Sequence, residues 1–415
     1  MDGRYRGPND SILYSPIGEY YSTLSLWDTY RAAHPLYTLL VPEKVNGFVN
    51  SMLSHCDTQG YLPIWALWGK ENHCMIGNHA IPVIVDAYLK GYKGFDPERA
   101  YEAIRKSSLE SHPKSDWETY NQYGYYPFDL IPEESVSRTL ESCYDDYCVA
   151  QMAKALGKKE DYNFFSKRAR AYTSLFDPVT KLMRGKDSQG KWREPFDPFR
   201  LSHAGTSGGD YTEGNAWQYV WHVQHDVDSL IEMMGGNKAF TAKLDSLFWL
   251  ENNTVNTGFV SDVTGLIGQY AHGNEPSHHV AYLYNYAGEF WKTQKLIREI
   301  FDHFYLPVSD GLCGNDDCGQ MSAWYLFSAM GFYPVDPISK EYIIGAPQLK
   351  EMILRLEGGK NFIIRAEGLS EENKYVKAVF LNGKELKRFR IFHHEITDGG
   401  ILEFIMTDNP SKSFN

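Results

Sequence analysis

The sequence predicts a mainly α-helical domain at residues 1–334, followed by a small antiparallel β module at residues 335–415. Two observations carry this prediction. From about Ser25 to Tyr333 the apolar residues recur with the period of a helix, and after Pro334 they alternate with polar residues as strands do. No strand pattern alternates with the helical segments, so a parallel α/β sheet is not expected.

The helical period predicts about eleven helices. One begins with Asp96 as N-cap, Pro97 as the first helical residue and Glu98 in the first turn. Helical hairpins in a ring, with long loops building a site at one end, account for this pattern; a bundle or an open solenoid is the alternative. The expected helices lie near residues 35–57, 76–91, 97–109, 134–156, 159–176, 214–223, 225–234, 238–248, 278–289, 291–305 and 318–331.

The C-terminal module is expected to consist of short strands joined by tight turns. Gly358-Gly359 and Asn382-Gly383 are typical of hairpin turns, because glycine and asparagine accept the positive φ that such turns need. With about 75 residues the module is marginal in stability alone, so we expect it to pack on something larger. The expected strands are Met352–Leu356, Phe362–Ala366, Val376–Leu381, Leu386–Ile391 and Ile401–Met406.

Composition and charge exclude several classes of protein. The chain has 415 residues, 43% hydrophobic and 23% charged, which is typical of a globular protein and not of a disordered or fibrous one. A formal net charge of −12 argues against nucleic acid or anionic lipid as a partner. The best apolar stretch, Ile81 to Leu89, contains Asp86 and is shorter than the roughly 20 residues of a membrane span.

The cysteines and the N-terminal residues say little about the compartment. Six cysteines, widely spaced in a long chain, are expected to be free thiols. Cys313 and Cys318 do not form a zinc motif, because four residues separate them and no second Cys or His pair stands at a matching spacing. Residues 1–8 lack the apolar core of a secretory signal.

Aromatic residues are abundant. The chain has 29 Tyr, 22 Phe and 10 Trp, and many stand beside polar residues, as in Trp27-Asp28 and Trp217-Gln218-Tyr219. A pyranose ring has an apolar C–H face and a polar rim, so aromatic faces with polar neighbours suit sugars. Core packing is the alternative for most of these side chains.

Three junctions between a loop and a helix concentrate carboxylates and amides. In the first, glycines at 208 and 209 lead to Glu213 at a helix start, beside Trp217 and Tyr219. A carboxyl group against apolar rings can serve as a general acid. The alternative is a carboxylate that complements the helix dipole.

The second junction spans residues 272–279. Asn274 and Glu275 stand directly before Pro276 and present two oxygen ligands of the kind that a hard cation such as calcium takes. Glu275 and His278 also have the Glu-x-x-His spacing of di-iron bundles, but this is the only such pair and the proline indicates a helix start. Buried, hydrogen-bonded imidazoles are the alternative for His278 and His279.

The third junction, residues 310–325, contains the neighbouring carboxylates Asp316 and Asp317 before an amphipathic helix. Both are compatible with helix capping alone. Two adjacent carboxylates can also divide catalytic work, one acting on water as a base and the other fixing the water or a metal.

Together these segments resemble glycoside hydrolase family 92, the calcium-dependent exo-acting α-mannosidases, over nearly the whole chain. The resemblance rests on residues 213–219 (Glu-Gly-Asn-Ala-Trp-Gln-Tyr), on His272 to His279, on Gly314 to Trp324, and on Ser25 to Arg31 together with Gly77-Asn78-His79-Ala80. It implies an (α/α)6 toroid and an inverting mechanism in which Ca²⁺ holds the O2 and O3 hydroxyls of the terminal mannose and helps to distort its ring.

The resemblance also implies roles for individual residues. Glu213 matches the general acid and Asp317 the general base, assisted by Asn315 or Asp316. An inverting pair stands about 6.5–9.5 Å apart to admit a water, and two separate loops can provide that gap. The expected metal-binding residues are Asn274, Glu275 and Asn315. The expected substrate-binding residues are Trp27, Asp28, Trp217, Gln218 and His272.

The function implied is exo-hydrolysis of terminal α-linked mannose from mannose-rich glycans. Members selective for α-1,2 linkages carry an acidic residue where this sequence has Gly273, and some have Asp where it has Asn315, so the linkage stays open. The alternative function is a truncated, catalytically weak or inactive carbohydrate-binding remnant. A helical scaffold without ligand leaves the clustered Glu, Asn, Asp and Trp unexplained.

The family's large N-terminal β-sandwich, its linker and the opening of the helical domain have no counterpart in this sequence, so we expect a truncated member. Loss of a covering domain exposes apolar area. Such a chain is expected to be marginally stable, and to self-associate or to bind a separately encoded β-sandwich half. Family members are usually periplasmic or secreted.

Overall fold

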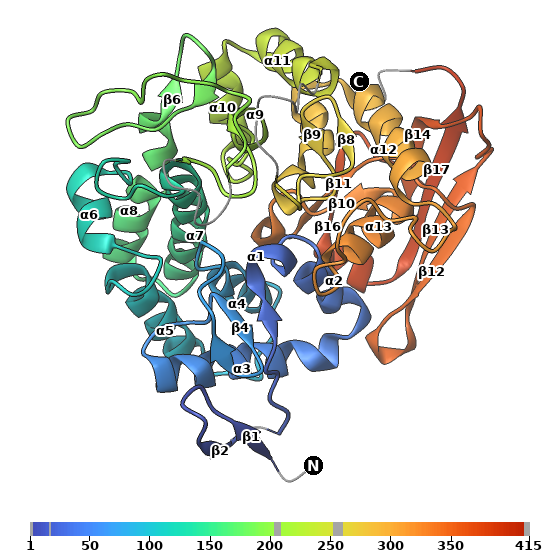
Figure 1. The fold of residues 1–415 in the computed structure, drawn as a ribbon. Helices are drawn as coiled ribbons and strands as arrows, with labels where there is room; N and C mark the ends of the chain where they lie inside the picture. Colours follow the sequence, from blue (N-terminus) through green and yellow to red (C-terminus); the bar gives the residue numbers. More distant parts are fainter. Residues whose placement is uncertain (1–2, 16–17, 203–208, 252–259, 411–415) are drawn as a thin grey trace. The chain divides into compact units, whose positions relative to one another are not determined.

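The computed structural model describes residues 3–15, 18–202, 209–251 and 260–410. The chain forms two compact units (Figure 1). The first comprises Met1–Tyr30, Glu43–His225 and Asn253–Val260, and the second Arg31–Pro42, Asp226–Asn252 and Ser261–Asn415. Gly208 and parts of the predicted loops 184–213 and 257–277 lie outside the described residues.

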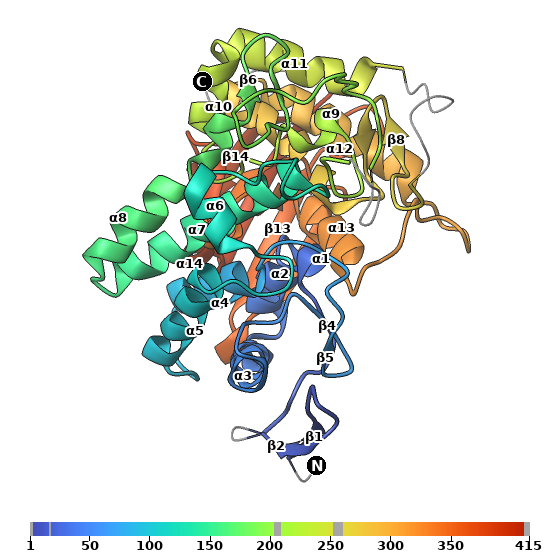
Figure 2. The same cartoon turned by 60° about the vertical axis from the view of Figure 1, so that its left-hand side comes forward.

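Helix α7 is the central element of the first unit. It is buried along most of its length and packs against α4, α5 and α8, and Figure 2 shows α8 alongside it. Its buried residues include polar and charged side chains, so this helix needs hydrogen-bond partners in the interior of the unit. The helices of this unit are α1 (Leu26–Thr29), α3 (Pro42–Gln59), α4 (Ala80–Leu89), α5 (Pro97–Leu109), α6 (Trp117–Tyr123), α7 (Ser135–Ala155), α8 (Lys159–Arg168), the 3₁₀ helix η1 (Ala171–Ser174) and α9 (Ala216–Tyr219).

Three small antiparallel sheets accompany these helices in the first unit. They correct the expectation that no strand interrupts the helical domain, because short hairpins in the loops carry too few residues to show a strand period. Their strands are β1 (Arg4–Arg6) with β2 (Ile12–Tyr14), β3 (Leu24–Ser25) with β4 (Trp65–Leu67) and β5 (Lys70–Glu71), and β6 (Phe176–Asp177) with β7 (Leu182–Met183).

The second unit combines helices with a C-terminal β module. No helix in the described part of the chain is long and apolar enough to cross a membrane. The helices of this unit are α2 (Ala33–Leu40), α10 (Val227–Met234), α11 (Asn237–Trp249), α12 (Phe290–Phe304), α13 (Gln320–Met330), α14 (His393–Thr397) and the 3₁₀ helices η2 (Glu275–Ser277), η3 (Val280–Ala287), η4 (Pro337–Ser339) and η5 (Glu357–Gly359).

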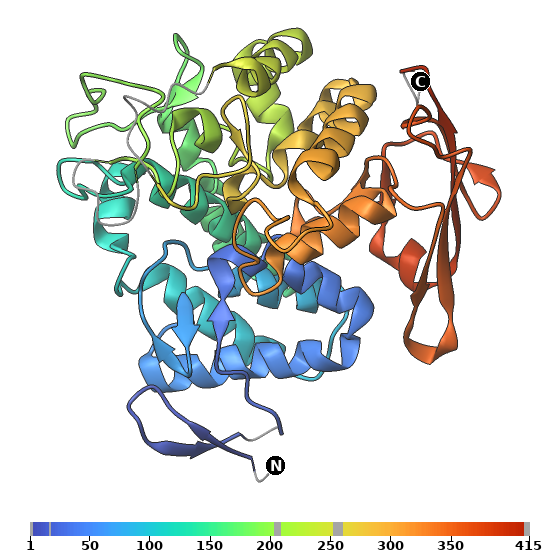
Figure 3. The same ribbon diagram turned by 45° about the vertical axis from the view of Figure 1, so that its right-hand side comes forward.

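The strands of the module, coloured orange to red in Figure 3, form a five-stranded sheet in the order β12-β13-β17-β14-β15. Burial alternates along β13 and β17, so one face forms a core. The sheet packs on α12, where the Val376 amide donates to Gln294 at 3.0 Å. The other strands pair as β8-β9 and as β10-β11-β16. The bounds are β8 (Leu266–Ile267), β9 (Tyr270–Ala271), β10 (Phe332–Tyr333), β11 (Glu341–Ile344), β12 (Glu351–Arg355), β13 (Asn361–Glu367), β14 (Tyr375–Leu381), β15 (Lys384–Glu385), β16 (Arg390–Phe392) and β17 (Gly400–Thr407).

The β module differs from the prediction in two ways. Strands β13 and β17 are parallel, so the sheet is mixed and not purely antiparallel. The strand expected at Leu386–Ile391 is present only at its end, where Arg390 and Ile391 belong to β16, which is in a different sheet from β15. Sheet β10-β11-β16 joins residues on both sides of Pro334, and the domain boundary at that residue stays a prediction.

Several helix predictions also need correction. The helix expected at 35–57 is two helices, because Pro42 disfavours helical backbone at Val41, whose φ is −138°. The helix expected at 214–223 is only the four-residue α9, and that at 278–289 is the 3₁₀ helix η3. The segment 159–176 ends its α-helix at Arg168.

Other local predictions are confirmed. Asp96 caps α5 by accepting hydrogen bonds from the amides of Glu98 and Arg99 at 2.9 and 3.3 Å. Asn382 and Gly383 have positive φ in the β14–β15 hairpin. All six cysteines are free thiols.

Candidate active site

The loop of the first unit that carries Glu213 is fixed on both sides of that residue. The Thr212 amide donates to Ser137 Oγ at 2.7 Å, and Gly214 exchanges two backbone hydrogen bonds with Ser202 at 3.0 and 3.1 Å. Between these anchors the half-buried Glu213 has φ of 47°, a left-handed conformation that costs roughly 1–2 kcal/mol for a residue with a Cβ. Carboxylates held in such conformations by their neighbours cluster at functional sites.

The residues after Glu213 form a capping box at the start of α9. Asn215 Oδ1 accepts from the amides of Trp217 and Gln218 at 3.0 and 3.2 Å, and Gln218 Oε1 accepts from the Asn215 amide at 2.9 Å. This cap satisfies the first amides of a four-residue helix. Gln218, predicted to bind substrate, thus orients the Glu213 loop. The buried Trp217 stacks with Phe199 at a centroid distance of 6.2 Å.

Helix α1 carries Trp27 and Asp28, both predicted to contact sugar. Asp28 is buried; its carboxylate accepts from Ser25 Oγ and, at 3.2 Å, from Trp65 Nε1. The Trp27 side chain is 1% exposed, and its Nε1 donates to Glu141 Oε1 at 3.0 Å. Trp27 is thus packed and hydrogen-bonded within the chain, and its sugar contact stays a prediction.

A buried ionic cluster lies behind these residues in the first unit. His79 Nδ1 is 2.9 Å from Asp145 Oδ1, and His79 Nε2 is 2.9 Å from Glu141 Oε2. Burial by itself disfavours the imidazolium, but Asp145 and then Glu141 outweigh it and raise the pKa of His79 to about 9. His79 is therefore protonated at neutral pH.

Glu141 connects this cluster to two of the recognised motifs. Its Oε1 accepts from Trp27 Nε1 at 3.0 Å and from the Tyr219 hydroxyl at 3.2 Å. Sequence reasoning missed Glu141 and Asp145, which stand four residues apart on α7. The available signal was two carboxylates inside the long helix predicted near residues 134–156; the structure shows them buried, and such groups are almost never buried without a partner.

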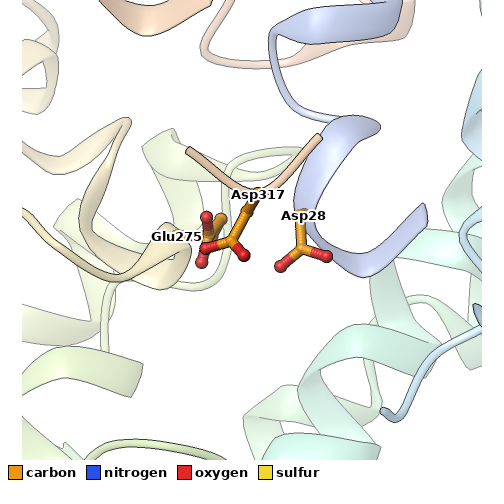
Figure 4. Close-up of side chains that lie close together, drawn as sticks. All are labelled: Asp28, Glu275 and Asp317. Carbon is orange, nitrogen blue, oxygen red and sulfur yellow. The ribbon is translucent and has the colours of Figure 1, made fainter. Parts of the chain in front are cut away.

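In the second unit Glu275 and Asp317 lie close together, as Figure 4 shows; Asp28, also labelled there, belongs to the first unit. Glu275 and Asp317 each offer a carboxylate oxygen, and these two atoms lie within 4.8 Å of one another. Burial, followed by the charges of Asp262 and Asp316, raises the pKa of Asp317, while a hydrogen bond with Glu275 opposes the rise. The two carboxylates need a shared proton or a cation to compensate their charge.

The loop before α13 presents Asp317 in a strained backbone conformation. Asp317 has φ of 46°, and Cys318 and Gly319 follow at 55° and 96°. Asp316 Oδ1 instead accepts from the amide and hydroxyl of Ser322 at 3.0 and 2.7 Å. The structure thus separates the adjacent carboxylates, because the Asp316 side chain binds Ser322 in the first turn of α13, while the N-cap of that helix is Gly319.

The three predicted metal ligands differ in burial. Asn274 and Glu275 are buried at the start of η2, and Asn315 is exposed in the loop before Asp316. Oxygen donors of this kind suit a hard cation. The described geometry brings Asp317 to Glu275 and thus adds a carboxylate that was predicted only as a base.

His272 and His278 are both buried and uncharged. The ring nitrogens of His272 are each 2.8 Å from a tyrosine hydroxyl, those of Tyr270 and Tyr305, and burial lowers its pKa well below the usual value. Both ring nitrogens of His272 are thus hydrogen-bonded within the chain, and its sugar contact stays a prediction. His278 Nδ1 accepts from Gln320 at 3.0 Å, and burial lowers its pKa to about 3.

Carboxylates on separate loops, together with aromatic side chains, are features of glycoside hydrolases. The chain matches the glycosyl hydrolase family 92 catalytic domain over residues 1–408. It belongs to that family.

Three relatives illustrate the similarity. The structure of the family GH92 alpha-mannosidase BT3965 from Bacteroides thetaiotaomicron, in complex with mannoimidazole, superposes with a TM-score of 0.94 at 46% identity, covering 99% of this chain and 54% of that one. The family GH92 inverting mannosidase BT2199 from the same organism gives 0.88 at 38% identity, covering 99% and 56%. An uncharacterized secreted glycosidase of Arthroderma benhamiae is 30% identical over 433 residues, which cover 95% of this chain and 52% of that protein. The chain spans about half the length of these relatives.

Proposed function

We propose that this chain is an exo-acting α-mannosidase that hydrolyses terminal α-linked mannose from mannose-rich glycans with inversion at the anomeric carbon. Membership of family 92 and two structural relatives named as mannosidases, one of them inverting, support the proposal. In the same proposal the helices form the (α/α)6 toroid implied by the sequence resemblance.

One observation of the structure carries the assignment of the catalytic pair. Glu213 and Asp317 share a left-handed backbone, with φ of 47° and 46°, in loops that lead into α9 and α13. This conformation is unfavourable for a carboxylate side chain, and neither residue is the N-cap of its helix, which is Asn215 in α9 and Gly319 in α13. Their positions are therefore better explained by chemistry than by folding.

The proposed reaction balances across these two groups. Asp317 accepts a proton from water while the water oxygen attacks the anomeric carbon. The glycosidic C–O bond breaks, and Glu213 donates its proton to the leaving oxygen. One carboxylate and one carboxylic acid exchange roles in each turnover, and proton exchange with solvent restores them.

We include calcium in the proposal, held by Glu275 with Asn274 and Asn315. The donors fit, because they are all oxygen ligands and because the buried carboxylate of Glu275 lies beside that of Asp317. When bound, the ion would supply positive charge for neighbouring sugar hydroxyls. The chain's own contribution is to orient these oxygens at the start of η2, where Pro276 fixes the backbone.

The proposal is tested with Glu213→Gln and Asp317→Asn on an aryl α-mannoside and on mannobiose. Both variants should lose most turnover of mannobiose, and Glu213→Gln should lose less on the activated aryl substrate, because that leaving group needs less protonation. Asp316→Asn is the matched control. It keeps the Oδ1 acceptor of Ser322 and should slow turnover far less than Asp317→Asn.

Proton NMR of the first product formed distinguishes β-mannose, expected for inversion, from α-mannose. Mannobiose turnover by Glu213→Gln at the parent rate would contradict the acid assignment. Sugar binding without turnover by the parent chain would instead support the carbohydrate-binding alternative.

A further inference from the structure

A tryptophan stands at the tip of the hairpin formed by β4 and β5 in the first unit. Figure 2 labels the two strands. The two-residue turn between Leu67 and Lys70 consists of Trp68 and Gly69, with φ of 52° and 83°. The Trp68 residue is 70% exposed. Positive φ at both central residues is the geometry of a type I′ turn, which favours Asn-Gly.

The conformation of this turn explains Gly69 but not Trp68. A Cβ at position 69 would lie 2.6 Å from the carbonyl oxygen of Arg6, so only glycine fits there. Trp68 carries a Cβ and an indole in a left-handed conformation that asparagine adopts at lower cost. A residue chosen for turn stability would be Asn or Gly.

Core packing does not explain Trp68 either. Among the described residues its indole takes part in no ring stacking, cation–π contact or side-chain hydrogen bond, although its backbone amide lies 3.5 Å from Thr23 Oγ1. Trp68 thus combines an unfavourable backbone conformation with an exposed apolar side chain, and neither feature stabilises the fold. Such positions are candidates for function.

The hairpin that carries Trp68 is fixed to a predicted sugar-contacting residue. At its base Trp65 Nε1 donates to Asp28 Oδ2 at 3.2 Å, and Glu71 accepts from the Trp65 amide at 2.9 Å. At its tip the Gly69 amide donates to Ser22 O at 2.6 Å. Trp68 follows Trp65 by three residues, so at a rise of about 3.3 Å per residue it lies about 10 Å further along the strand.

Charged groups surround the tip. Lys70 Nζ donates to Asp10 Oδ2 at 2.6 Å, and Arg6 Nε donates to Asp10 Oδ1 at 2.6 Å, all three side chains being exposed. An apolar ring with hydrogen-bonding groups beside it matches the apolar face and the polar rim of a pyranose.

We propose that Trp68 is a stacking platform for a sugar ring of the glycan beyond the terminal mannose. The inference rests on the proposed mannosidase function and adds to it a preference for substrates longer than one sugar. The hydrogen bond between Trp65 and Asp28 holds the hairpin that carries Trp68 against helix α1.

The test compares a linear α-linked mannotetraose with an aryl α-mannoside, for the parent chain and for Trp68→Asn. The ratio of kcat/KM for the tetraose to that for the aryl mannoside should fall about three- to tenfold, the size of one ring stacked on an aromatic face. Tm should stay the same or rise, because Asn suits the turn. Trp68→Phe should restore most of the ratio.

Trp249→Asn is the matched control, since Trp249 is 82% exposed at the end of α11 and should leave the ratio unchanged. An unchanged ratio in Trp68→Asn, or an equal fall in both variants, would overturn the proposal. Calorimetric binding of mannotetraose to Glu213→Gln, with and without Trp68→Asn, separates the two hypotheses. If the parent chain hydrolyses neither substrate but binding still weakens with Trp68→Asn, the proposed function fails and the platform stands.

Discussion

Raising the pH from 6.5 to above 9 should weaken the fold around His79. Its pKa in the folded chain, about 9, lies above the ordinary value of 6.5, so the folded state holds the proton more tightly than the unfolded state. The stabilisation is fully present below pH 6.5 and is lost as the pH rises through 9. At about 1.4 kcal/mol per pKa unit, the contribution to the free energy of unfolding is about 3 kcal/mol.

The titration itself can be followed by NMR of a chain with ¹³C-labelled histidine, in which the His79 signal is assigned by its absence from His79→Gln. The groups that face the imidazole are Asp145, Glu141 and the stacked ring of Tyr30. Urea denaturation at pH 6.5 and 9.5 then measures the accompanying loss of stability.

Glu141→Gln and Asp146→Asn form a matched pair on α7. Glu141→Gln removes one carboxylate from His79 and should lower the His79 pKa. Asp146 accepts from Arg168 Nε at 2.7 Å and does not contact His79, so Asp146→Asn should destabilise the chain but leave that pKa in place. A His79 pKa at or below 6.5 in the parent chain, or an equal response to both variants, would refute the reasoning.

Two further predictions concern the loops of the candidate site. Asn215→Ala should lower the free energy of unfolding by about 1 kcal/mol, because it removes the side-chain cap of α9, and it should lower kcat by loosening the Glu213 loop. Urea denaturation measures the first effect and steady-state kinetics the second. Asn215→Ser retains a cap and should recover most of each loss. Chelation by EDTA should abolish mannoside hydrolysis, and added Ca²⁺ should restore it; full activity after exhaustive chelation would remove calcium from the proposal.

Local chemistry made some elements predictable from the sequence. The cap at Asp96 and the turn at Asn382-Gly383 depend on residues within a few positions of each other, and both are present. The break at Val41 was equally local but was missed, because the apolar period continues across Pro42 while the backbone does not. The parallel pairing of β13 with β17 depends on strand order, which hairpin patterns do not contain.

In the candidate site, too, local motifs were predictable from the sequence and long-range packing was not. Motif recognition predicts roles for Glu213, Glu275 and Asp317, but it does not distinguish the exposed members of a motif from the buried ones. Trp27 and His272 are buried, and their polar atoms are used by Glu141 and by tyrosine hydroxyls. Burial depends on packing between residues far apart in the sequence, so two residues of the same motif can differ in their exposure.

Backbone conformation supplies what the motifs lacked. Glu213, Asp317 and Trp68 all have positive φ, as does Glu134, whose carboxylate accepts from Thr212 Oγ1 at 2.9 Å beside Glu213. Glutamate and tryptophan are disfavoured there, whereas aspartate and asparagine are enriched in this region, and Asn382 suits its hairpin turn. A strained residue persists only where its surroundings hold it, and here the surroundings are hydrogen-bonded loops that lead into α7, α9, α13 and the β4–β5 hairpin. Positive φ also occurs at Lys114, Lys181 and Lys340, which have no proposed chemistry, so the backbone of Glu213, Asp317 and Trp68 supports their proposed roles in combination with the contacts that hold their loops.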